Sequence, residues 1–485
     1  MHTGVLVIVA AIFTIVVAIL GRLIQNSLLV GKKPPIFEDV PFIGGLLKFL
    51  KGPWGLISEG YSRYGEVFTV PVATQRITFL IGPDVAPHFF KASDDEMSQT
   101  EVYKFNVPTF GPGVVYDVEQ KIRTEQFRFF TEALKKDRLK KYVPQFVMEA
   151  EAYFSKWEET GVVDFAEEFS KLVTLTAART LLGREVREQM FEKVSSLLHD
   201  LDEGMIPIST IAPYLPIPAH RKRDRARKEL RDIFAKVVRE RRASGAKEED
   251  VLQQFIDAKY QNVYGGRHTT DEEICGLLIA SLFAGQHTSS ITTAWTGLYM
   301  TENKAISWDK AVKEQQDMIK AHGSEISYDV LQELDVLHRC VTEALRMHPP
   351  LIMVLRYAKT PFSVTTRSGK EYHIPQGDVV AASPNFAHTL PYVFADPLKY
   401  DPDRFAPPRE EDKKTPFGFV GFGGGRHGCI GSNFAYLQIK TIWSVLMRNF
   451  EFELLDPVPE PEYNAMVIGP KPCRVRYTRR KLQVA

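Results

Sequence analysis

A cysteine within a glycine-rich loop is the side chain in this sequence best suited to bind a metal. Residues 422–431 read FGGGRHGCIG, so glycines flank Cys429 on both sides. Glycine adopts conformations that other residues resist and lets a backbone approach a flat ligand closely. A helical pattern, SNFAYLQIKTIWSVLM, follows at once. The free N–H groups of a helix start favour a thiolate, which an iron porphyrin needs in order to cleave O–O bonds. The alternative is a buried structural cysteine.

The other bulk properties of the chain exclude several classes of protein. Its four cysteines include no CxxC pair, so they indicate neither a disulfide framework nor a zinc knuckle in 485 residues. We expect Cys275, Cys340 and Cys473 to be reduced thiols. A formal charge of +1 gives no reason to propose a nucleic acid partner.

Two further spacings place chemical groups on one face of a helix. Glu343 and Arg346 are three residues apart, so their side chains can pair, although a surface ion pair of little value is the alternative. Ala284 and Thr288 are four apart within a long apolar stretch, where a small residue and a hydroxyl would leave room for dioxygen. Helix packing is the alternative there. His287 has a near-neutral pKa and can relay protons.

The pattern along the chain predicts a mainly α fold with small β-sheets. Helical periodicity dominates from Gln120 to Arg346, with predicted helices at 125–147, 164–182 and 221–242. Strand-like runs lie near 68–81 and 351–383, and the second contains the turn Arg-Ser-Gly-Lys at 367–370. No long linker follows Pro35.

The amino-terminal segment predicts a membrane anchor. Gly4 to Gly21 carries no formal charge, and basic residues follow at Arg22, Lys32 and Lys33. By the positive-inside rule that end stays in the cytosol. We therefore divide the chain into an anchor, 1–31, and one soluble domain, 32–485; a cleaved signal peptide is the alternative. A second uncharged stretch, 274–301, carries many polar groups, so we expect a core helix there.

Residues 206–218, IPISTIAPYLPIP, form an apolar loop rich in proline. Two interpretations stay open: the loop covers the core, or it enters the membrane interface and admits an apolar substrate.

These motifs together resemble the cytochrome P-450 family. The cysteine loop is similar to its haem-binding loop, with His427 where most members carry arginine. Glu343 and Arg346 resemble its Glu-x-x-Arg motif, and Arg404 resembles the arginine that completes that cluster and supports the haem loop. The segment 284–289 resembles its oxygen-activation segment, and His287 is the form found in sterol 14α-demethylases. Residues 103–117 resemble the substrate-recognition segment of those demethylases, most closely in green plants and algae.

The resemblance implies a cytochrome P-450 fold with haem b, iron protoporphyrin IX, buried between a long central helix and the cysteine loop with its following helix. It implies catalytic roles for Thr288, His287 and Ala284, with Cys429 on the iron. The implied contacts to the haem propionates are Tyr103, Tyr116, Arg123, Arg356 and His427, although the register leaves Arg123 and Thr124 as alternatives. The implied substrate-lining residues are Phe105, Phe110, Met205, Leu351, Met353, Leu355, Met466 and Val467.

The resemblance also implies a reaction. Three oxygenations would convert the 14α-methyl group of a sterol to an alcohol, then an aldehyde, and then formate, leaving a Δ14 double bond. Dioxygen and electrons from NADPH, delivered by NADPH–cytochrome P-450 reductase, would serve a single-pass enzyme of the endoplasmic reticulum membrane. Phe105 implies obtusifoliol, a 4-monomethyl sterol, since in the family an aromatic residue at this position accompanies 4-monomethyl substrates and a smaller aliphatic residue accompanies 4,4-dimethyl ones. The physical reason would be that the ring fills the space of a second 4-methyl group. The alternatives are another lipid substrate, or a non-catalytic membrane protein that binds haem or sterol.

Overall fold

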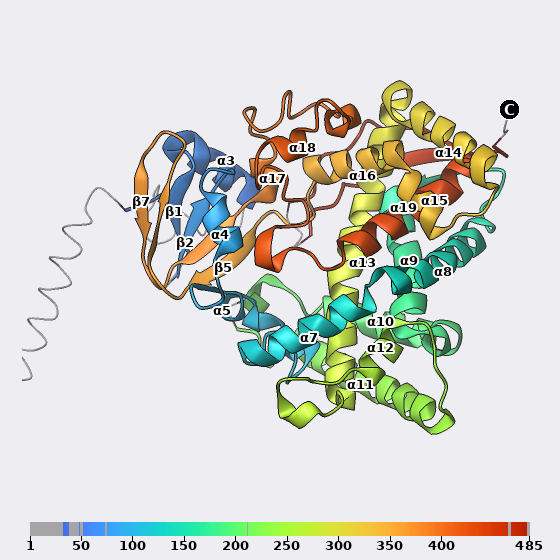
Figure 1. The fold of residues 1–485 in the computed structure, drawn as a ribbon, viewed down its shortest axis with the longest axis horizontal. Helices are drawn as coiled ribbons and strands as arrows, with labels where there is room; N and C mark the ends of the chain where they lie inside the picture. The colour runs from blue at the N-terminus through green and yellow to red at the C-terminus, as the bar shows by residue number, and fades with distance from the viewer. Residues whose placement is uncertain are drawn as a thin grey trace, which may run out of the picture.

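One long helix, α13 (Asp271–Glu302), passes through the middle of the helical part of the protein (Figure 1). Thr270 and Glu273 form a capping box at its start, where three acidic residues complement the helix dipole. It is the one helix among the described residues that is long and apolar enough to cross a membrane. Trp295, Leu298 and most of its other residues are buried against neighbouring helices, which confirms the predicted core helix.

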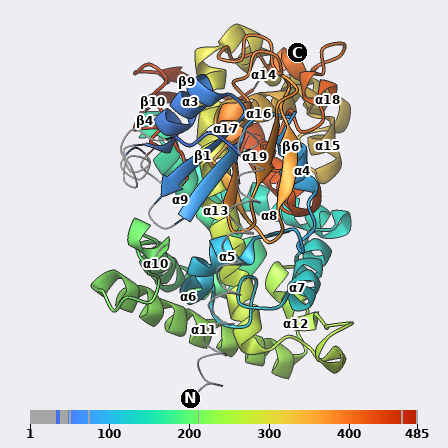
Figure 2. The ribbon, with the colours of Figure 1, turned by 90° about the vertical axis from the view of Figure 1, so that its left-hand side faces the viewer.

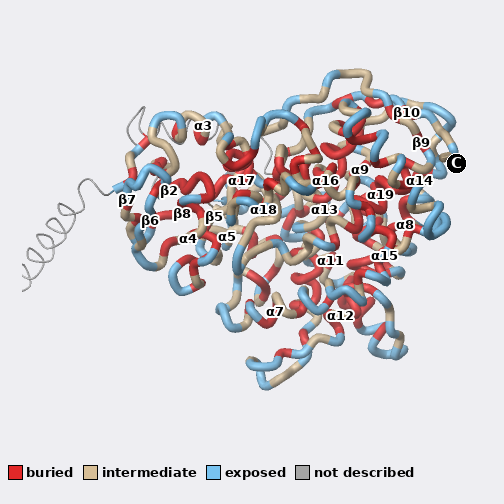
Figure 3. The backbone as a smooth tube through the Cα atoms, turned by 45° about the horizontal axis from the view of Figure 1, so that its top comes forward, coloured by how far each residue is buried: buried red, intermediate tan, exposed pale blue. Residues whose placement is uncertain are grey.

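The computed structural model describes residues 33–37, 48, 52–72, 75–210, 212–463 and 467–482. The predicted anchor, 1–31, and Met466 lie outside these ranges. A smaller β-rich part stands beside a larger helical part (Figures 1 and 2). The buried segments are concentrated in the helical part around α13, α16 (Asp335–Met347) and α19 (Ser432–Asn449) (Figure 3).

The structure confirms the predicted class, mainly α with small β-sheets. Besides α13, α16 and α19, it contains many further helices. They are α3 (Pro53–Tyr64), α4 (Ala86–Lys91), α5 (Thr100–Tyr103), α6 (Val107–Phe110), α7 (Gln120–Ala133), α8 (Lys136–Phe154), α9 (Phe165–Ala177), α10 (Phe191–Asp202), α11 (Pro218–Ser244), α12 (Val251–Asp257), α14 (Trp308–His322), α15 (Tyr328–Glu333), α17 (Pro384–Ala387) and α18 (Glu411–Lys414). Short 3-10 turns include η1 (Lys104–Asn106), η7 (Pro402–Phe405) and η8 (Gly425–His427).

The β-rich part is built on a five-stranded sheet of order β1-β2-β8-β5-β3. Its strands are β1 (Val67–Val72), β2 (Gln75–Leu80), β3 (Met97–Ser98), β5 (Val354–Ala358) and β8 (Val379–Ala382), and only β2 and β8 pair in parallel. A second, three-stranded sheet has the order β4-β10-β9. Its strands are β4 (Thr160–Asp164), β10 (Arg474–Arg479) and β9 (Phe450–Leu454). The predicted turn at 367–370 connects the hairpin β6 (Phe362–Thr365) and β7 (Glu371–Ile374).

The predicted helices match the structure with one exception. The helix predicted at 125–147 is wrong as a single element, because Leu134 and Lys135 leave helical geometry and Lys135 is extended, so α7 and α8 are separate. The helix predicted from 164 is confirmed: the Asp164 side chain accepts from the N–H of Glu167 as an N-cap, and the chain continues from α9 into a π-helical turn at Ala178–Leu182. The helix predicted at 221–242 lies within α11.

Candidate functional site

The loop around Cys429 is closed by its own backbone and pressed against α4. The Cys429 N–H donates to the Phe422 carbonyl oxygen at 2.8 Å. Gly425 has a φ of +62°, and a Cβ atom there would lie 2.0 Å from the Phe90 carbonyl oxygen of α4. Only glycine satisfies both the backbone angle and this approach. The glycine pattern seen in the sequence is therefore what holds the cysteine at the start of α19.

The Cys429 thiol is exposed, unlike the other three cysteines, which are buried. Burial of its surroundings nevertheless raises its pKa, and the nearby Gly431 N–H only partly opposes this. The thiolate at the helix start stays a prediction for the protein with a bound metal. A coordinated metal ion deprotonates a thiol outright. Within the described ranges no group of three or more His, Cys, Asp and Glu side chains could hold a metal ion.

Arg356 is a buried cation without a carboxylate partner. It is 4% exposed. Its Nη1 donates to the carbonyl oxygen of the preceding residue, Leu355, at 2.9 Å, and its guanidinium lies 4.9 Å from the Phe89 ring centroid. No carboxylate lies within ion-pair distance of it in the part of the chain that the structure describes, and burial lowers its pKa. A buried charge without a partner is costly, so this position fits an anionic ligand group.

Two tyrosines lie beside this arginine. The rings of Tyr103 and Tyr116 stack at 5.4 Å, and burial raises the pKa of both. The Leu355 N–H donates to the Tyr103 hydroxyl oxygen at 3.0 Å, which fixes the ring against β5. Arg356 lowers the pKa of each phenol in part, which places all three groups together.

At the start of α7, Arg123 is buried and Thr124 is not. Arg123 is 4% exposed, and its two terminal nitrogens donate to Asp94 at 3.1 Å and to the Thr100 hydroxyl at 3.0 Å. Thr124 is exposed. His427 Nε2 lies 3.0 Å from the same Asp94 carboxylate, and burial together with Arg356 lowers the pKa of His427 to about 4. Arg123 and His427 therefore meet at one carboxylate, Asp94, which the sequence did not single out.

These residues fit a haem. A thiol within a glycine loop suits the iron, and buried cations with phenol hydroxyls suit two propionates, as charge-assisted bonds require.

A buried ionic cluster stands behind the cysteine loop. Glu343 is fully buried and accepts from Arg346 at 2.7 and 2.9 Å and from Arg404 at 3.0 Å. Arg404 lies in η7 and also donates to Glu411 at 2.8 Å. The three residues were predicted to meet, and the alternative of a surface ion pair is wrong because all are buried.

His388 connects this cluster to the loop and was missed by sequence reasoning. Its Nδ1 donates to the Arg346 carbonyl oxygen at 2.9 Å, while its Nε2 accepts from the Val420 N–H at 2.9 Å. Burial and the Arg346 charge lower its pKa to about 3, so the ring stays neutral. A lone histidine outside any helical pattern carried no signal of this role.

The central turn of α13 is its least buried part. Ala284 is exposed and Thr288 half-buried, whereas most of the helix on either side is buried. The Thr288 hydroxyl donates to the Ala284 carbonyl oxygen at 2.8 Å. His287 Nε2 lies 3.3 Å from Asp202 at the end of α10, and this bond raises the pKa of His287. Asp202 is a second acid that the sequence did not indicate, because it lies 85 residues away.

The segment at 103–117 reaches this turn. Phe110 packs edge-on against Phe283, the residue before Ala284, at 6.1 Å, and lies 6.2 Å from Tyr116. Phe105, in η1, lies 6.5 Å from the Tyr103 ring. The Thr109 hydroxyl contacts the Met205 sulfur at 3.3 Å, which joins the segment to the start of the apolar loop.

The remaining predicted substrate residues that the structure describes lie in and before β5 and in the segment beside it, where the Ile468 N–H donates to the Pro350 carbonyl oxygen at 2.9 Å. Met353 and Leu355 pack against the apolar core of the β-rich part, and Val467 is half-buried. Leu351 is 43% exposed. Met466 lies outside the described residues.

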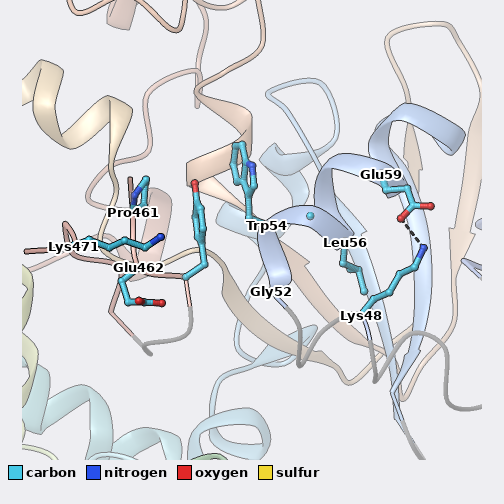
Figure 4. A pocket seen from close by; sticks show the side chains of 10 residues that line it. Lys48, Gly52, Trp54, Leu56, Glu59, Pro461, Glu462 and Lys471 are labelled. Carbon is cyan, nitrogen blue, oxygen red and sulfur yellow. Dashed lines mark hydrogen bonds and ion pairs between the residues drawn. The ribbon is translucent and has the colours of Figure 1, made fainter. Parts of the chain in front are cut away.

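A cavity of about 500 Å³ lies between the start of α3 and the residues Pro461, Glu462, Tyr463 and Lys471 (Figure 4). Trp54 stacks on Tyr463 at 5.8 Å along it, and Lys48 pairs with Glu59 at 2.6 Å. None of the predicted site residues that the structure describes lines this cavity.

Comparisons with known proteins agree on one family. The family model described as Cytochrome P450 matches residues 34–477. The chain is 60% identical over 455 residues to an obtusifoliol 14-alpha demethylase of Triticum aestivum, covering 93% of this chain and 100% of the relative. It is 59% identical to a sterol 14-demethylase of Arabidopsis thaliana, covering 91% of this chain and 90% of the relative. A retinoic acid-bound cyanobacterial CYP120A1 shares the fold, with a TM-score of 0.78 at 23% identity, over 92% of this chain and 99% of that one.

Replacing Glu343 with glutamine should destabilise the fold by about 3–5 kcal/mol, because it leaves buried guanidinium groups unpaired. Urea unfolding measures the loss. Lys171→Ala is the control: Lys171 pairs with Glu167 at the surface, so its loss should cost less than about 1 kcal/mol. Equal losses in the two variants would contradict a structural role for the buried cluster.

Proposed function

This chain belongs to the cytochrome P450 family, and we propose that it removes the 14α-methyl group of a sterol, with obtusifoliol as the preferred substrate. The observation that carries the proposal is the segment 103–117. It supplies Tyr103 and Tyr116 beside Arg356, and through Phe110 it contacts the α13 turn that holds Ala284 and Thr288. Relatives that match nearly the whole chain carry the names of sterol demethylases, which supports the same reaction.

Cys429 would hold the haem iron from the α19 side, and Arg356, Arg123, His427, Tyr103 and Tyr116 would hold the propionates. A haem with a thiolate ligand supplies the activation of dioxygen. The residues of the chain orient the cofactor and the sterol and deliver protons.

The proton path we propose begins at Asp202. Its side chain is 46% exposed and that of His287 34% exposed, so the pair connects solvent to the central turn of α13. The carboxylate favours the protonated imidazole, which can then pass a proton inward and be reprotonated from solvent. Thr288, on the neighbouring position, holds its hydroxyl proton toward the Ala284 carbonyl.

The overall reaction would proceed in three oxygenations. Each uses one dioxygen and two electrons: the methyl group becomes an alcohol, the alcohol becomes an aldehyde, and the last step breaks the carbon–carbon bond. The products are formate and a sterol with a Δ14 double bond. Electrons would come from NADPH through NADPH–cytochrome P450 reductase.

We propose a membrane location for the enzyme, as a single-pass protein of the endoplasmic reticulum with its catalytic domain in the cytosol. The uncharged start of the sequence supports this. So does the loop between α10 and α11, where Ile208, Tyr214 and Leu215 are 39%, 67% and 40% exposed. Their exposure favours the membrane interface over a role in covering the core.

Replacing Cys429 with alanine should abolish both the ferrous carbonyl spectrum and sterol conversion, because the iron loses its thiolate. Spectra of the reduced protein with carbon monoxide and sterol product analysis measure this. Cys473→Ala should retain both properties, since that thiol is buried near Pro457. A Cys429→Ala protein with an unchanged spectrum would remove the haem assignment.

Phe105→Ile should shift preference by about tenfold from obtusifoliol toward a 4,4-dimethyl sterol, because the smaller side chain frees room for a second methyl group. Competition between the two sterols gives the ratio of kcat/KM values. Phe127→Ile, in α7 against Phe130, should leave this ratio unchanged. The substrate argument fails if Phe105→Ile behaves like that control.

Asp202→Asn should move the pH dependence of sterol oxidation to lower pH. Asp202 raises the pKa of His287, so its loss lowers that pKa, and the protonated fraction falls at any given pH. We expect a decrease of about tenfold or less in product formed per NADPH at neutral pH.

The control for this variant is Glu203→Gln, because the neighbouring Glu203 pairs with Lys222 at 2.7 Å instead of His287. A pH profile of Asp202→Asn that superimposes on the wild-type profile would contradict the proton path.

A further inference from the structure

Asp94 is a buried carboxylate where the haem site should favour cations. It lies in the turn between α4 and β3, and its side chain is 9% exposed. One carboxylate oxygen accepts from Arg123 at 3.1 Å and lies 3.0 Å from His427 Nε2. The other accepts from the Gln120 amide at 3.1 Å. The acid therefore contacts two of the groups that would hold the propionates.

The position of Asp94 is fixed from several sides. The Lys359 ammonium donates to its backbone carbonyl at 3.2 Å, which ties the turn to the end of β5. The Arg123 guanidinium donates two hydrogen bonds, to Asp94 and to the Thr100 hydroxyl, so its orientation is restricted. The negative charge of Asp94 also acts on Arg356, where it partly opposes the lowering of the Arg356 pKa by burial.

Charge pairing alone does not explain why Asp94 is present at this site. Arg123 and Arg356 bring two positive charges to this place. Two propionates alone would balance the arginines. Asp94 adds a further negative charge in a buried place, where solvent and salt screen it weakly.

We propose that Asp94 is a positioning residue that also sets the reduction potential of the haem: it orients Arg123 and His427 toward the propionates and offsets part of the positive charge of Arg123. Reduction adds an electron to the iron, so a fixed negative charge nearby disfavours it and lowers the potential. This inference rests on the haem assignment proposed above.

The test is a spectroelectrochemical titration of the ferric/ferrous couple in the purified full-length holoenzyme. Asp94→Asn keeps the shape of the side chain and removes its charge. We expect its midpoint potential to be more positive than that of the wild type, by more than the scatter between repeated titrations. Asp94→Glu, which retains the charge, should stay closer to the wild type than Asp94→Asn does.

Two controls separate charge from position and from general surface effects. Asp95→Asn removes the same charge from the adjacent, exposed residue and should leave the potential unchanged. Thr100→Val removes the second bond to Arg123 without any change of charge, and should shift the potential less than Asp94→Asn. If Asp94→Asn is not recovered folded, Asp94→Ser, a smaller neutral residue, takes its place with the same expectation.

An Asp94→Asn potential equal to or below that of the wild type would overturn the inference, and so would an equal shift in Asp95→Asn. A wild-type protein without haem would instead overturn the proposed function. The two failures are therefore distinguishable in one set of titrations.

Discussion

The architecture of the site depends on one buried carboxylate, Glu343. It receives three guanidinium bonds, from Arg346 and Arg404, and also the Asp401 N–H at 3.0 Å. A buried charge is tolerated only when its hydrogen bonds are satisfied, so these segments must come together for the chain to fold. Because Arg346 is bonded through its carbonyl to His388, and His388 to Val420, the same cluster fixes the chain just before the cysteine loop. The position of Cys429 is thus set from behind by an ionic core.

Buried charge is used differently on the two sides of that loop. Behind it, each arginine of the cluster has a carboxylate and carbonyl oxygens as partners. In front of it, the partners of Arg356 among the described residues are the Leu355 carbonyl, the Gln99 side-chain amide and the Phe89 ring, and none of them is a carboxylate. The first arrangement closes a network and stabilises the fold. The second leaves Arg356 without an anionic partner in the described protein, so that partner must come from a ligand. Asp94 already neutralises part of the charge of the neighbouring Arg123.

The distal side of the site is joined to the surface loop between α10 and α11. Ser209 donates to the Gly204 carbonyl oxygen at 2.8 Å and contacts His220, whose other nitrogen lies 2.8 Å from the Leu215 carbonyl oxygen. Arg223 donates to Pro213 at 3.0 Å. Asp202, which pairs with His287, ends the helix that leads into this loop. The loop that presents apolar side chains to the outside is therefore held by the same segment that supplies the acid beside α13.

Local patterns in the sequence were enough to predict the helical class, the core helix α13, the hairpin turn at 367–370 and the pairing of Glu343 with Arg346, whereas the place of Arg404 in that cluster came from the family resemblance. Helix periodicity, glycine content and three-residue spacings are properties of neighbouring residues, so they are visible in one chain. The break between α7 and α8 was not visible, because apolar periodicity continues across Leu134 and Lys135. Asp94, Asp202 and His388 were not visible either, since each acts on a partner at least 29 residues away. Tertiary packing alone decides which buried cation meets a carboxylate and which is left for a ligand, because that depends on distances and desolvation between segments that the sequence does not place together.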